Sequence, residues 1–105
     1  MHVVTRKHLS DAASRYRDAA DEIAAWHQIV KDARWENFIQ VRQTFADADS
    51  VDGYVIFNIR HNRYRLVTVI HYSRKRNGKQ TMGHIYIRSF LPHKQYENRK
   101  NWDKD

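Results

Sequence analysis

The residues in this chain best suited to chemistry are arginines set among strand-forming apolar residues. The stretch Tyr54–Tyr72, YVIFNIRHNRYRLVTVIHY, is rich in Val, Ile, Tyr and Phe, which favour β-strands, and it breaks once, at Arg60-His61-Asn62. Arg63 and Arg65 stand two residues apart after this break, so they share one face of a strand. Arginines on an otherwise apolar sheet are costly unless an anion binds beside them. This face is therefore a candidate anion-binding site.

Charge over the whole chain points the same way. Lys and Arg total 19 against 12 Asp and Glu, a formal net charge of +7 with an isoelectric point near 9.9 in 105 residues. At this size such an excess indicates a polyanionic partner, nucleic acid before membrane, because no long basic amphipathic helix is evident. A charge excess that only keeps the protein in solution is the alternative.

Length and composition limit the other possibilities. The chain is long enough for one domain with its own core, so we expect a single domain over residues 1–105. It has no cysteine, which excludes disulfides and a thiolate zinc site. No apolar run approaches the length of a membrane span and no signal-peptide pattern opens the chain, so we expect a cytoplasmic protein.

The elements that must position the arginines divide the chain into a helical half and a strand half. A short apolar run, His2–Val4, predicts a brief edge strand, and residues 46–50, ADADS, predict a loop. Between them, Thr5, Asp18 and Asn37 are the expected N-caps of three helices. The spacing of apolar residues predicts their buried faces: Leu9, Ala12, Ala13 and Tyr16; then Ala19, Ile23, Trp26, Val30 and Ala33; then Phe38, Val41 and Phe45.

The strand half begins with Tyr54–Tyr72, which we interpret as an antiparallel hairpin, with Asn62 supplying the left-handed backbone of its turn. A basic connection, Ser73–Gly83, follows and contains Asn77-Gly78, a strong hairpin signal. His84–Leu91 predicts another strand, which Pro92 ends. Residues 93–96 predict a helical turn or a tight loop, and residues 98–105 a loosely ordered tail.

A two-residue loop at Asn77-Gly78 predicts the strand register. Arg76 then lies opposite Lys79, Val67 opposite Arg88, and Arg65 opposite Phe90. A bulge in the basic connection would shift this register by one residue. On this register one face of the sheet carries Arg63, Arg65, Val67, Val69, Tyr86 and Arg88, and the other, the core face, carries Leu66, Thr68, Ile70, Ile85, Ile87 and Leu91. The register of the first hairpin stays open, because loops of two and three residues place Phe57 and Asn58 on opposite faces.

The combination YVIFNIRHNRYRLVTVIHY followed by IYIRSFLPHKQY resembles the HigB toxins of bacterial type II toxin–antitoxin systems, which are RelE-like messenger-RNA interferases that cut translated RNA on the ribosome. The resemblance covers essentially the whole chain, and its specific part is FNI, then N-x-Y-R-L-V, then H-K-x-Y. It implies an α+β, RelE/ParE-like fold with N-terminal helices packed on one face of a small, mainly antiparallel β-sheet. The chain departs from the family in its hairpin loop, Arg60-His61-Asn62, and in its long basic connection.

The resemblance also implies a reaction and its residues. Arg65 matches the arginine of the Y-R-L strand, and His93, Lys94 and Tyr96 match H-K-x-Y. The expected reaction is attack of a ribose 2′-hydroxyl on the adjacent phosphate, with no metal and no small-molecule cofactor. Arginine suits stabilisation of the charged phosphorane, and an imidazole with an ordinary pKa near ~6.5 suits proton transfer. Which residue is the base and which the acid does not follow from the sequence.

Further residues are expected to bind RNA or its phosphates: Asn62, Arg63, Arg74, Lys75, Arg76, Tyr86 and Arg88. Each candidate also has a structural interpretation. The interpretations are a solvated strand-edge charge for Arg63, a turn residue for Asn62, an ion pair with Glu97 for Arg88, the cap of a turn for His93, a packed ring or a base-stacking ring for Tyr96, and a soluble loop tip for Arg74–Arg76. His71 and His84 face each other in this register, and a solvent-exposed pair is favoured over a metal site.

The resemblance and these residues leave two candidate functions. The first is an endoribonuclease toxin acting on translated messenger RNA, and the alternative is a non-catalytic RNA- or ribosome-binding module that uses the same basic face with Tyr86 and Tyr96 as stacking platforms. His93 separates them, because a binding module has little need of it. The resemblance further implies a cognate HigA-type helix-turn-helix antitoxin. That partner either covers the face of Arg65, Arg88 and His93 or binds the helical half and blocks entry to the ribosome.

Overall fold

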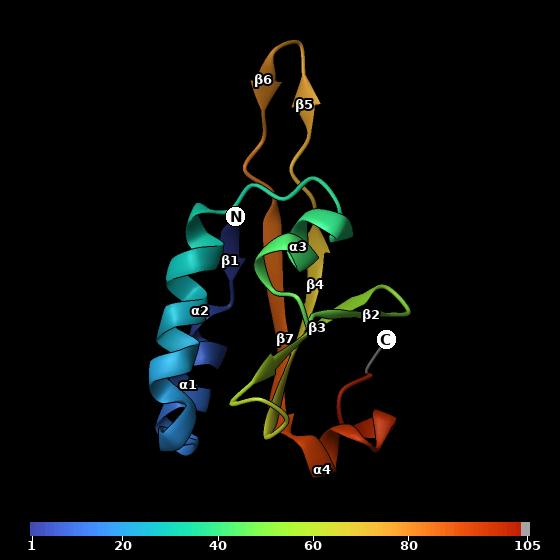
Figure 1. Ribbon diagram of the computed structural model, residues 1–105. Coiled ribbons are helices and arrows are strands. Elements are labelled where there is room, and N and C mark those ends of the chain that lie inside the picture. Colours follow the sequence, from blue (N-terminus) through green and yellow to red (C-terminus); the bar gives the residue numbers. More distant parts are fainter. Residues whose placement is uncertain (104–105) are drawn as a thin grey trace.

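The computed structural model describes residues 1–103, and its elements follow the expected order of a helical half and a strand half (Figure 1). The helical half holds β1 (His2–Val4), α1 (Arg6–Arg15), the 3₁₀ turn η1 (Arg17–Ala19), α2 (Ala20–Asp32) and α3 (Phe38–Thr44). The strand half holds β2 (Asp49–Val51), β3 (Tyr54–Ile59), β4 (Tyr64–His71), β5 (Lys75–Arg76), β6 (Lys79–Gln80), β7 (His84–Pro92), α4 (His93–Tyr96) and the 3₁₀ turn η2 (Arg99–Asn101).

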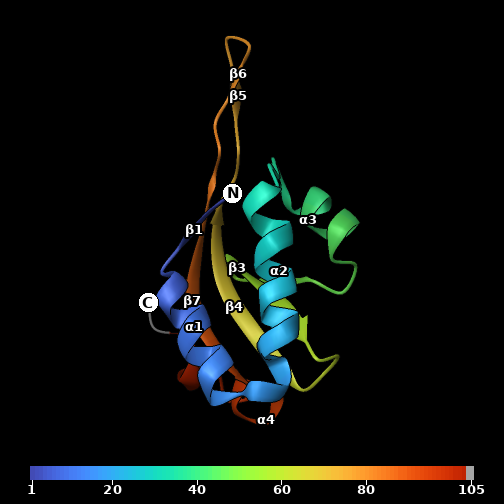
Figure 2. The same cartoon turned by 90° about the vertical axis from the view of Figure 1, so that its left-hand side faces the viewer.

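One five-stranded sheet organises the molecule, in the order β1-β7-β4-β3-β2. In this sheet β1 and β7 pair in parallel, and the other described neighbours are antiparallel. Helix α1 contacts β7 and α2, while α2 contacts β1, and the two helices run side by side along the sheet (Figure 2). The predicted α+β fold, with helices on one face of a mainly antiparallel sheet, is therefore confirmed. None of the helices in the described part is long and apolar enough to cross a membrane.

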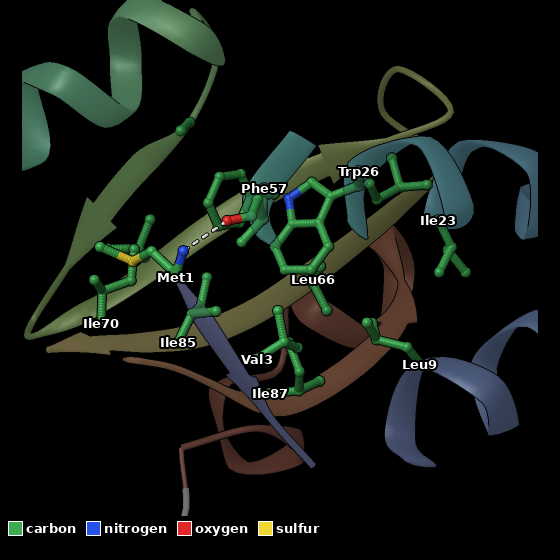
Figure 3. Close-up of a cluster of buried hydrophobic side chains, with 14 of the residues drawn as sticks. Met1, Val3, Leu9, Ile23, Trp26, Phe57, Leu66, Ile70, Ile85 and Ile87 are labelled. Carbon is green, nitrogen blue, oxygen red and sulfur yellow. Dashed lines mark hydrogen bonds between the residues drawn. The ribbon is translucent and has the colours of Figure 1, made fainter. Parts of the chain in front are cut away.

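The main core lies between α1, α2 and the sheet (Figure 3). Trp26, at 2% exposure, packs edge-on against Phe57 of β3 with their ring centroids 5.3 Å apart. The predicted α2 stripe is confirmed, because Ala19, Ile23 and Val30 are buried with Trp26. The expectation that Trp26 anchors the core follows from the helical spacing alone and is correct.

The helix caps were only partly predictable. Asn37 caps α3 as expected, because its side-chain oxygen accepts a hydrogen bond from the Gln40 backbone N–H at 3.0 Å. Thr5 precedes α1, but it has a left-handed backbone (φ 70°) and forms no capping bond. Asp18 does not cap α2, which begins at Ala20 after the η1 turn. The loop predicted over residues 46–50 is also shorter than expected, because β2 begins at position 49 and pairs with β3.

The β3–β4 hairpin is confirmed, but its turn is not the expected one. Ile59 pairs with Tyr64, which leaves a loop of residues 60–63. The left-handed residues are Arg60 (φ 56°) and His61 (φ 58°), not Asn62. This register places Phe57 on the helix side of the sheet, where it joins the core.

The predicted β4–β7 register is correct at one end and wrong at the other. Arg76 pairs with Lys79, and the ladder from His71 to Thr68 follows the expected pairing. A bulge then interrupts it, because Thr68 pairs with Ile87 while Val67 pairs with Ser89. Arg88 is thus the extra residue of the bulge, within the ladder rather than in the basic connection, and every pair beyond it is shifted by one.

This shift exchanges two side chains between the faces of the sheet. Arg65 pairs with Leu91 instead of Phe90. Leu91 belongs to a second buried cluster on the face away from the helices, with Val67 and Trp102. Phe90 packs on the helix side against Tyr64, with ring centroids 5.3 Å apart. The face that carries Arg65 is therefore partly apolar and partly covered, rather than open.

Candidate active site

Arg65 is held in place by the hairpin that precedes it. It lies near the start of β4, half-buried, and its Nη1 donates hydrogen bonds to the carbonyls of Asn62 at 3.1 Å and Tyr64 at 3.3 Å. No carboxylate pairs with it among residues 1–103. Because Nη1 already binds the loop, the remaining guanidinium donors are the ones available to an anion.

Tyr96 on α4 lies against Arg65. The Arg65 guanidinium carbon is 5.6 Å from the centroid of the Tyr96 ring, a cation–π arrangement. The Trp102 indole stacks on the same phenol, with centroids 5.0 Å apart and an interplanar angle of 10°. Arg65 and Trp102 therefore both contact the Tyr96 ring, which the alternative interpretation requires for stacking on an RNA base. The predicted packing of Tyr96 is thus the interpretation that the geometry favours.

The Tyr96 hydroxyl stays protonated over a wide pH range. Burial raises its pKa above the ordinary value of 10.0, and the nearby Asp49 carboxylate raises it further. Arg65 and Arg99 act in the opposite direction but do not outweigh burial. Tyr96 at neutral pH is therefore a hydrogen-bond donor and a source of a proton, not a base.

The segment after α4, residues 97–103, folds back so that Trp102 packs against Tyr96, and the sequence did not predict this contact. Trp102 is only 4% exposed, and its Nε1 donates to the Tyr96 carbonyl at 2.8 Å. Arg99 lies over the Trp102 ring at 5.3 Å and forms ion pairs at 2.7 Å with Asp52 and Asp103. Tyr54 packs edge-on against the indole.

This packing contradicts the expectation of a loosely ordered tail over residues 98–105, as far as the structure describes it. Trp102 is buried against the sheet, and Arg99 and Asp103 bond to Asp52 and Tyr54, so the expectation does not describe residues 98–103, while residues 104 and 105 lie outside the described part. A lone tryptophan, Trp102, in a charged segment is the one signal that pointed to packing, because so large an apolar surface is usually buried.

His93 begins α4 beside the hairpin loop. Its backbone N–H donates to the Arg63 carbonyl at 2.8 Å, which joins α4 to the loop that also holds Arg65. Its ring Nε2 is 3.1 Å from a carboxylate oxygen of Glu97, while Nδ1 is buried and has no partner among the described residues. Glu97 thus pairs with His93, and not with Arg88 as one sequence interpretation had it. Lys94 is exposed on the same turn.

Arg63 points away from this group. It lies in the loop rather than on β4, and its Nη1 donates to Asp18 at 2.7 Å. Tyr64, on the helix side, donates its hydroxyl to the same carboxylate at 2.7 Å. These two hydrogen bonds hold the pKa of Asp18 below its ordinary value of 3.8. Arg63 and Arg65 therefore do not share a face of the sheet, contrary to the prediction. Asn62 is exposed, and its carbonyl accepts a hydrogen bond from Arg65.

Two further predicted residues lie elsewhere on the sheet. Arg88, at the bulge, is exposed beside a recess that also contains the carboxylates of Asp52 and Asp103 and the Arg99 guanidinium. Tyr86 lies opposite Val69, and its ring contacts His71 edge-on, with centroids 4.9 Å apart. The predicted convergence is therefore not observed, because the structure spreads Arg65, Tyr86 and Arg88 along the sheet.

The basic run Arg74–Arg76 lies at the other end of the molecule. It forms one side of the β5–β6 hairpin, which projects beyond the sheet at the end opposite α4 (Figure 1). His71 and His84 do face each other, as the register predicted. Within residues 1–103, no group of three or more His, Asp or Glu side chains is arranged to hold a metal ion.

One end of the sheet thus brings together a permanently charged guanidinium, a neutral phenol and an imidazole tied to a carboxylate. A guanidinium can bind a phosphate and stabilise negative charge on it, while a phenol and an imidazole can each transfer a proton. All three groups lie where β4 and α4 meet. There the loop of residues 60–63 accepts two hydrogen bonds, one from the Arg65 side chain at the Asn62 carbonyl and one from the His93 backbone N–H at the Arg63 carbonyl.

Comparison with known proteins identifies the family of this chain. Residues 19–99 match the HigB toxin family, described as the RelE-like toxic component of a toxin–antitoxin system. The chain is 25% identical over 100 residues to the mRNA interferase toxin HigB of Escherichia coli K12, covering 92% of this chain and 88% of that protein. The proteins named mRNA interferase HigB from Escherichia coli O157:H7 and Shigella flexneri match to the same extent. This chain belongs to the HigB family of RelE-like toxins of toxin–antitoxin systems.

Proposed function

We propose that this toxin is an endoribonuclease that cleaves translated messenger RNA on the ribosome, with Arg65, Tyr96 and His93 at the cleavage site. The observation that carries the proposal is the Arg65 guanidinium, without a carboxylate partner among residues 1–103, lying over Tyr96 at the start of α4. The relatives named mRNA interferase support it. The HigB family supports an antitoxin partner, and we propose that it is of the HigA helix-turn-helix type.

The proposed reaction uses the RNA as its own nucleophile. The ribose 2′-oxygen attacks the adjacent phosphorus, the bond from phosphorus to the 5′-oxygen breaks, and the products are a 2′,3′-cyclic phosphate and a 5′-hydroxyl. The base takes the 2′ proton, and the acid gives a proton to the departing 5′-oxygen. This sequence of steps requires no metal and no small-molecule cofactor.

Arg65 has the role of stabilising the phosphorane. Its charge is permanent, and the donors not bound to Asn62 and Tyr64 can reach two phosphate oxygens as a planar fork. The Tyr96 ring against it restrains the guanidinium, so little rotamer freedom is lost when the anion binds. Lys94, exposed on the same turn as His93, adds positive charge for the flanking RNA backbone.

Tyr96 and His93 divide the two proton transfers. Because the pKa of Tyr96 is raised, its phenol suits the acid that protonates the 5′-oxygen. His93 is then the base, provided that its Nε2 leaves Glu97 when RNA binds. Both side chains are substantially exposed, 45% for His93 and 63% for Glu97, and a contact so open to solvent holds its partners weakly.

The alternative, a non-catalytic RNA- or ribosome-binding module, is favoured by one observation. Neither nitrogen of His93 faces solvent without a partner, since Nε2 is paired with Glu97 and Nδ1 is buried. If His93 keeps this state on RNA, the basic end of the sheet can bind a phosphate but His93 cannot accept a proton.

The deciding experiment compares His93→Gln and Arg65→Ala with the parent in ribosome binding and in single-turnover cleavage of translated RNA. We expect His93→Gln to lose cleavage and keep its affinity, because phosphate affinity comes mainly from Arg and Lys. Arg65→Ala should cleave about 10²–10³-fold more slowly, as with loss of one transition-state donor in other enzymes. Arg17→Ala, which removes an exposed charge on η1, is the matched control and should cleave normally. Parental cleavage by folded Arg65→Ala would refute the assigned site.

A further inference from the structure

The β5–β6 hairpin is a regular, paired projection rather than an irregular loop. Its turn residues, Asn77 (φ 53°) and Gly78 (φ 76°), both have the left-handed backbone of a type I′ turn, which matches the twist of the flanking strands. Lys75 pairs with Gln80 and Arg76 with Lys79. The hairpin extends the line of β4 and β7 beyond the end of the sheet (Figure 1).

The base of the hairpin is fastened to the body. The Ser73 backbone N–H donates to the Trp35 carbonyl at 2.8 Å, and the Ser73 hydroxyl donates to the Thr81 carbonyl. Arg74 and Thr81 exchange two bonds of 2.8 Å, one from each backbone N–H. Gly83 packs so closely that a Cβ there would lie 2.9 Å from the Ser73 nitrogen. An isolated two-stranded hairpin is marginally stable, so this fastening is what pre-organises it.

The hairpin concentrates positive charge that the rest of the protein does not neutralise. Between Ser73 and Gly83 the sequence has four basic residues and no acidic one, against a formal net charge of +7 for the whole chain. All four are exposed, and none forms an ion pair with residues 1–103: Arg74, Lys75, Arg76 and Lys79. Arg76 and Lys79 lie directly opposite each other, and like charges in such a pair destabilise a hairpin.

We propose that this hairpin is a second RNA-binding element, which holds the phosphate backbone of a structured RNA away from the cleavage site. A polyanion relieves the repulsion between Arg76 and Lys79 and gives the four exposed charges a partner. The inference rests on the proposed function only in that the polyanion is RNA. Ribosomal RNA and the messenger present the same phosphates, so the experiment has to separate these two sources.

The distance between the two sites excludes a shared nucleotide. Arg65 and His71 are six residues apart on β4, about 20 Å at ~3.3 Å per residue. Arg76 lies five residues further along the same direction, which brings the separation to roughly 35 Å for an extended chain, in a molecule 45 Å long. RNA at the hairpin is therefore a different segment from the one cut beside Arg65.

The test changes all four basic residues together and measures binding as a function of salt. The variant is Arg74→Gln, Lys75→Gln, Arg76→Gln and Lys79→Gln in the full chain, with circular dichroism and thermal melting to check the fold. The matched control removes four exposed charges from α1, η1 and α2: Arg6→Gln, Lys7→Gln, Arg17→Gln and Lys31→Gln. Both are measured on vacant ribosomes, on ribosomes programmed with messenger RNA, and on the purified antitoxin.

We expect the hairpin variant to bind ribosomes more than about tenfold more weakly at low salt, with the slope of log K against log salt reduced by roughly 3–4. The control variant should retain most of the ribosome affinity and most of the slope of log K against log salt. Loss on vacant ribosomes identifies ribosomal RNA as the source, and loss only on programmed ribosomes identifies the messenger. Unchanged affinity and slope on both, or weakened binding of the antitoxin alone, would overturn the proposal.

Cleavage separates this inference from the proposed function. The hairpin variant should need a higher toxin concentration to reach half of its maximal single-turnover rate, because its substitutions weaken binding and leave Arg65, Tyr96 and His93 untouched. Arg65→Ala should show the opposite pattern, with slow cleavage at every toxin concentration and a salt slope reduced by at most about 1. A parent that binds ribosomes through the hairpin but cleaves nothing would reject the proposed reaction and leave the RNA-binding element standing.

Discussion

Replacing Trp102 tests whether the C-terminal segment is part of the folded site. Its side chain is 4% exposed, it stacks on Tyr96, and its Nε1 donates to the Tyr96 carbonyl. Truncation of a buried tryptophan to alanine costs about 3–5 kcal/mol, a large share of the roughly 5–15 kcal/mol that stabilises a domain. Trp102→Ala should therefore lower the free energy of unfolding by about that amount.

The assay is urea unfolding followed by far-ultraviolet circular dichroism, in which a change of midpoint at constant slope reports stability. Trp102→Phe is the matched control. It keeps an aromatic ring against Tyr96 but loses the Nε1 hydrogen bond, so it should cost only about 1–2 kcal/mol. A loss below about 0.5 kcal/mol for Trp102→Ala, as at exposed surface positions, would refute the packed segment and restore the loosely ordered tail.

The same substitution affects cleavage if Tyr96 is the acid. Without the indole, the Tyr96 ring loses its stacking partner and the carbonyl of Tyr96 loses its hydrogen bond. Trp102→Ala should therefore slow single-turnover cleavage while leaving ribosome affinity near that of the parent, and Trp102→Phe should recover most of the rate. Equal cleavage by a correctly folded Trp102→Ala variant would remove the segment from any role in positioning Tyr96.

Three other predictions follow from the described contacts. Because the pKa of Asp18 is lowered in the folded state, its contribution to stability is present above the unfolded pKa of about 3.8 and is lost as the pH falls through the lower folded value; Asp18→Asn should remove that part of the acid dependence in melts between pH 2 and 5, and an unchanged profile would contradict the ion pair. Because the pKa of Tyr96 is raised, the alkaline limb of cleavage that it controls should lie above pH 10.0 and vanish in Tyr96→Phe; a Tyr96-dependent loss of rate below that pH would reject its role as acid. Hydrogen exchange with and without antitoxin should show protection across residues 5–45 if the partner blocks entry to the ribosome, whereas protection confined to residues 63–69 and 88–96 would mean that it covers the site.

The sequence alone determined the larger divisions of this protein. Helical spacing predicted the buried face of α2 around Trp26, and β-branched and aromatic residues predicted the β3–β4 hairpin, because these patterns depend only on the local period of the backbone. Asn77-Gly78 predicted the β5–β6 turn for the same reason, since the left-handed backbone of that turn is a property of its own two residues. Family membership followed from ordered motifs that span most of the chain.

The tertiary structure decided which of the candidate residues meet. The bulge at Arg88 leaves no local trace in the sequence, yet it moves Leu91 to the Arg65 face and Phe90 to the core. The partner of Arg63 is likewise distant in the sequence, since Asp18 lies 45 residues before it. The partner of Tyr96 depends on the turn after α4, which brings Trp102 to stack on the Tyr96 ring.

The same dependence on distant contacts explains why the sequence predicted only part of the candidate site. Residue types at Arg65, His93 and Tyr96 indicated phosphate chemistry, because the charge and proton-transfer capacity of a side chain belong to the residue itself. Whether an arginine is free to bind an anion, or an imidazole nitrogen is free to accept a proton, depends on neighbours brought in by folding. Arg63 is paired with Asp18, His93 with Glu97, and Arg65 with neither.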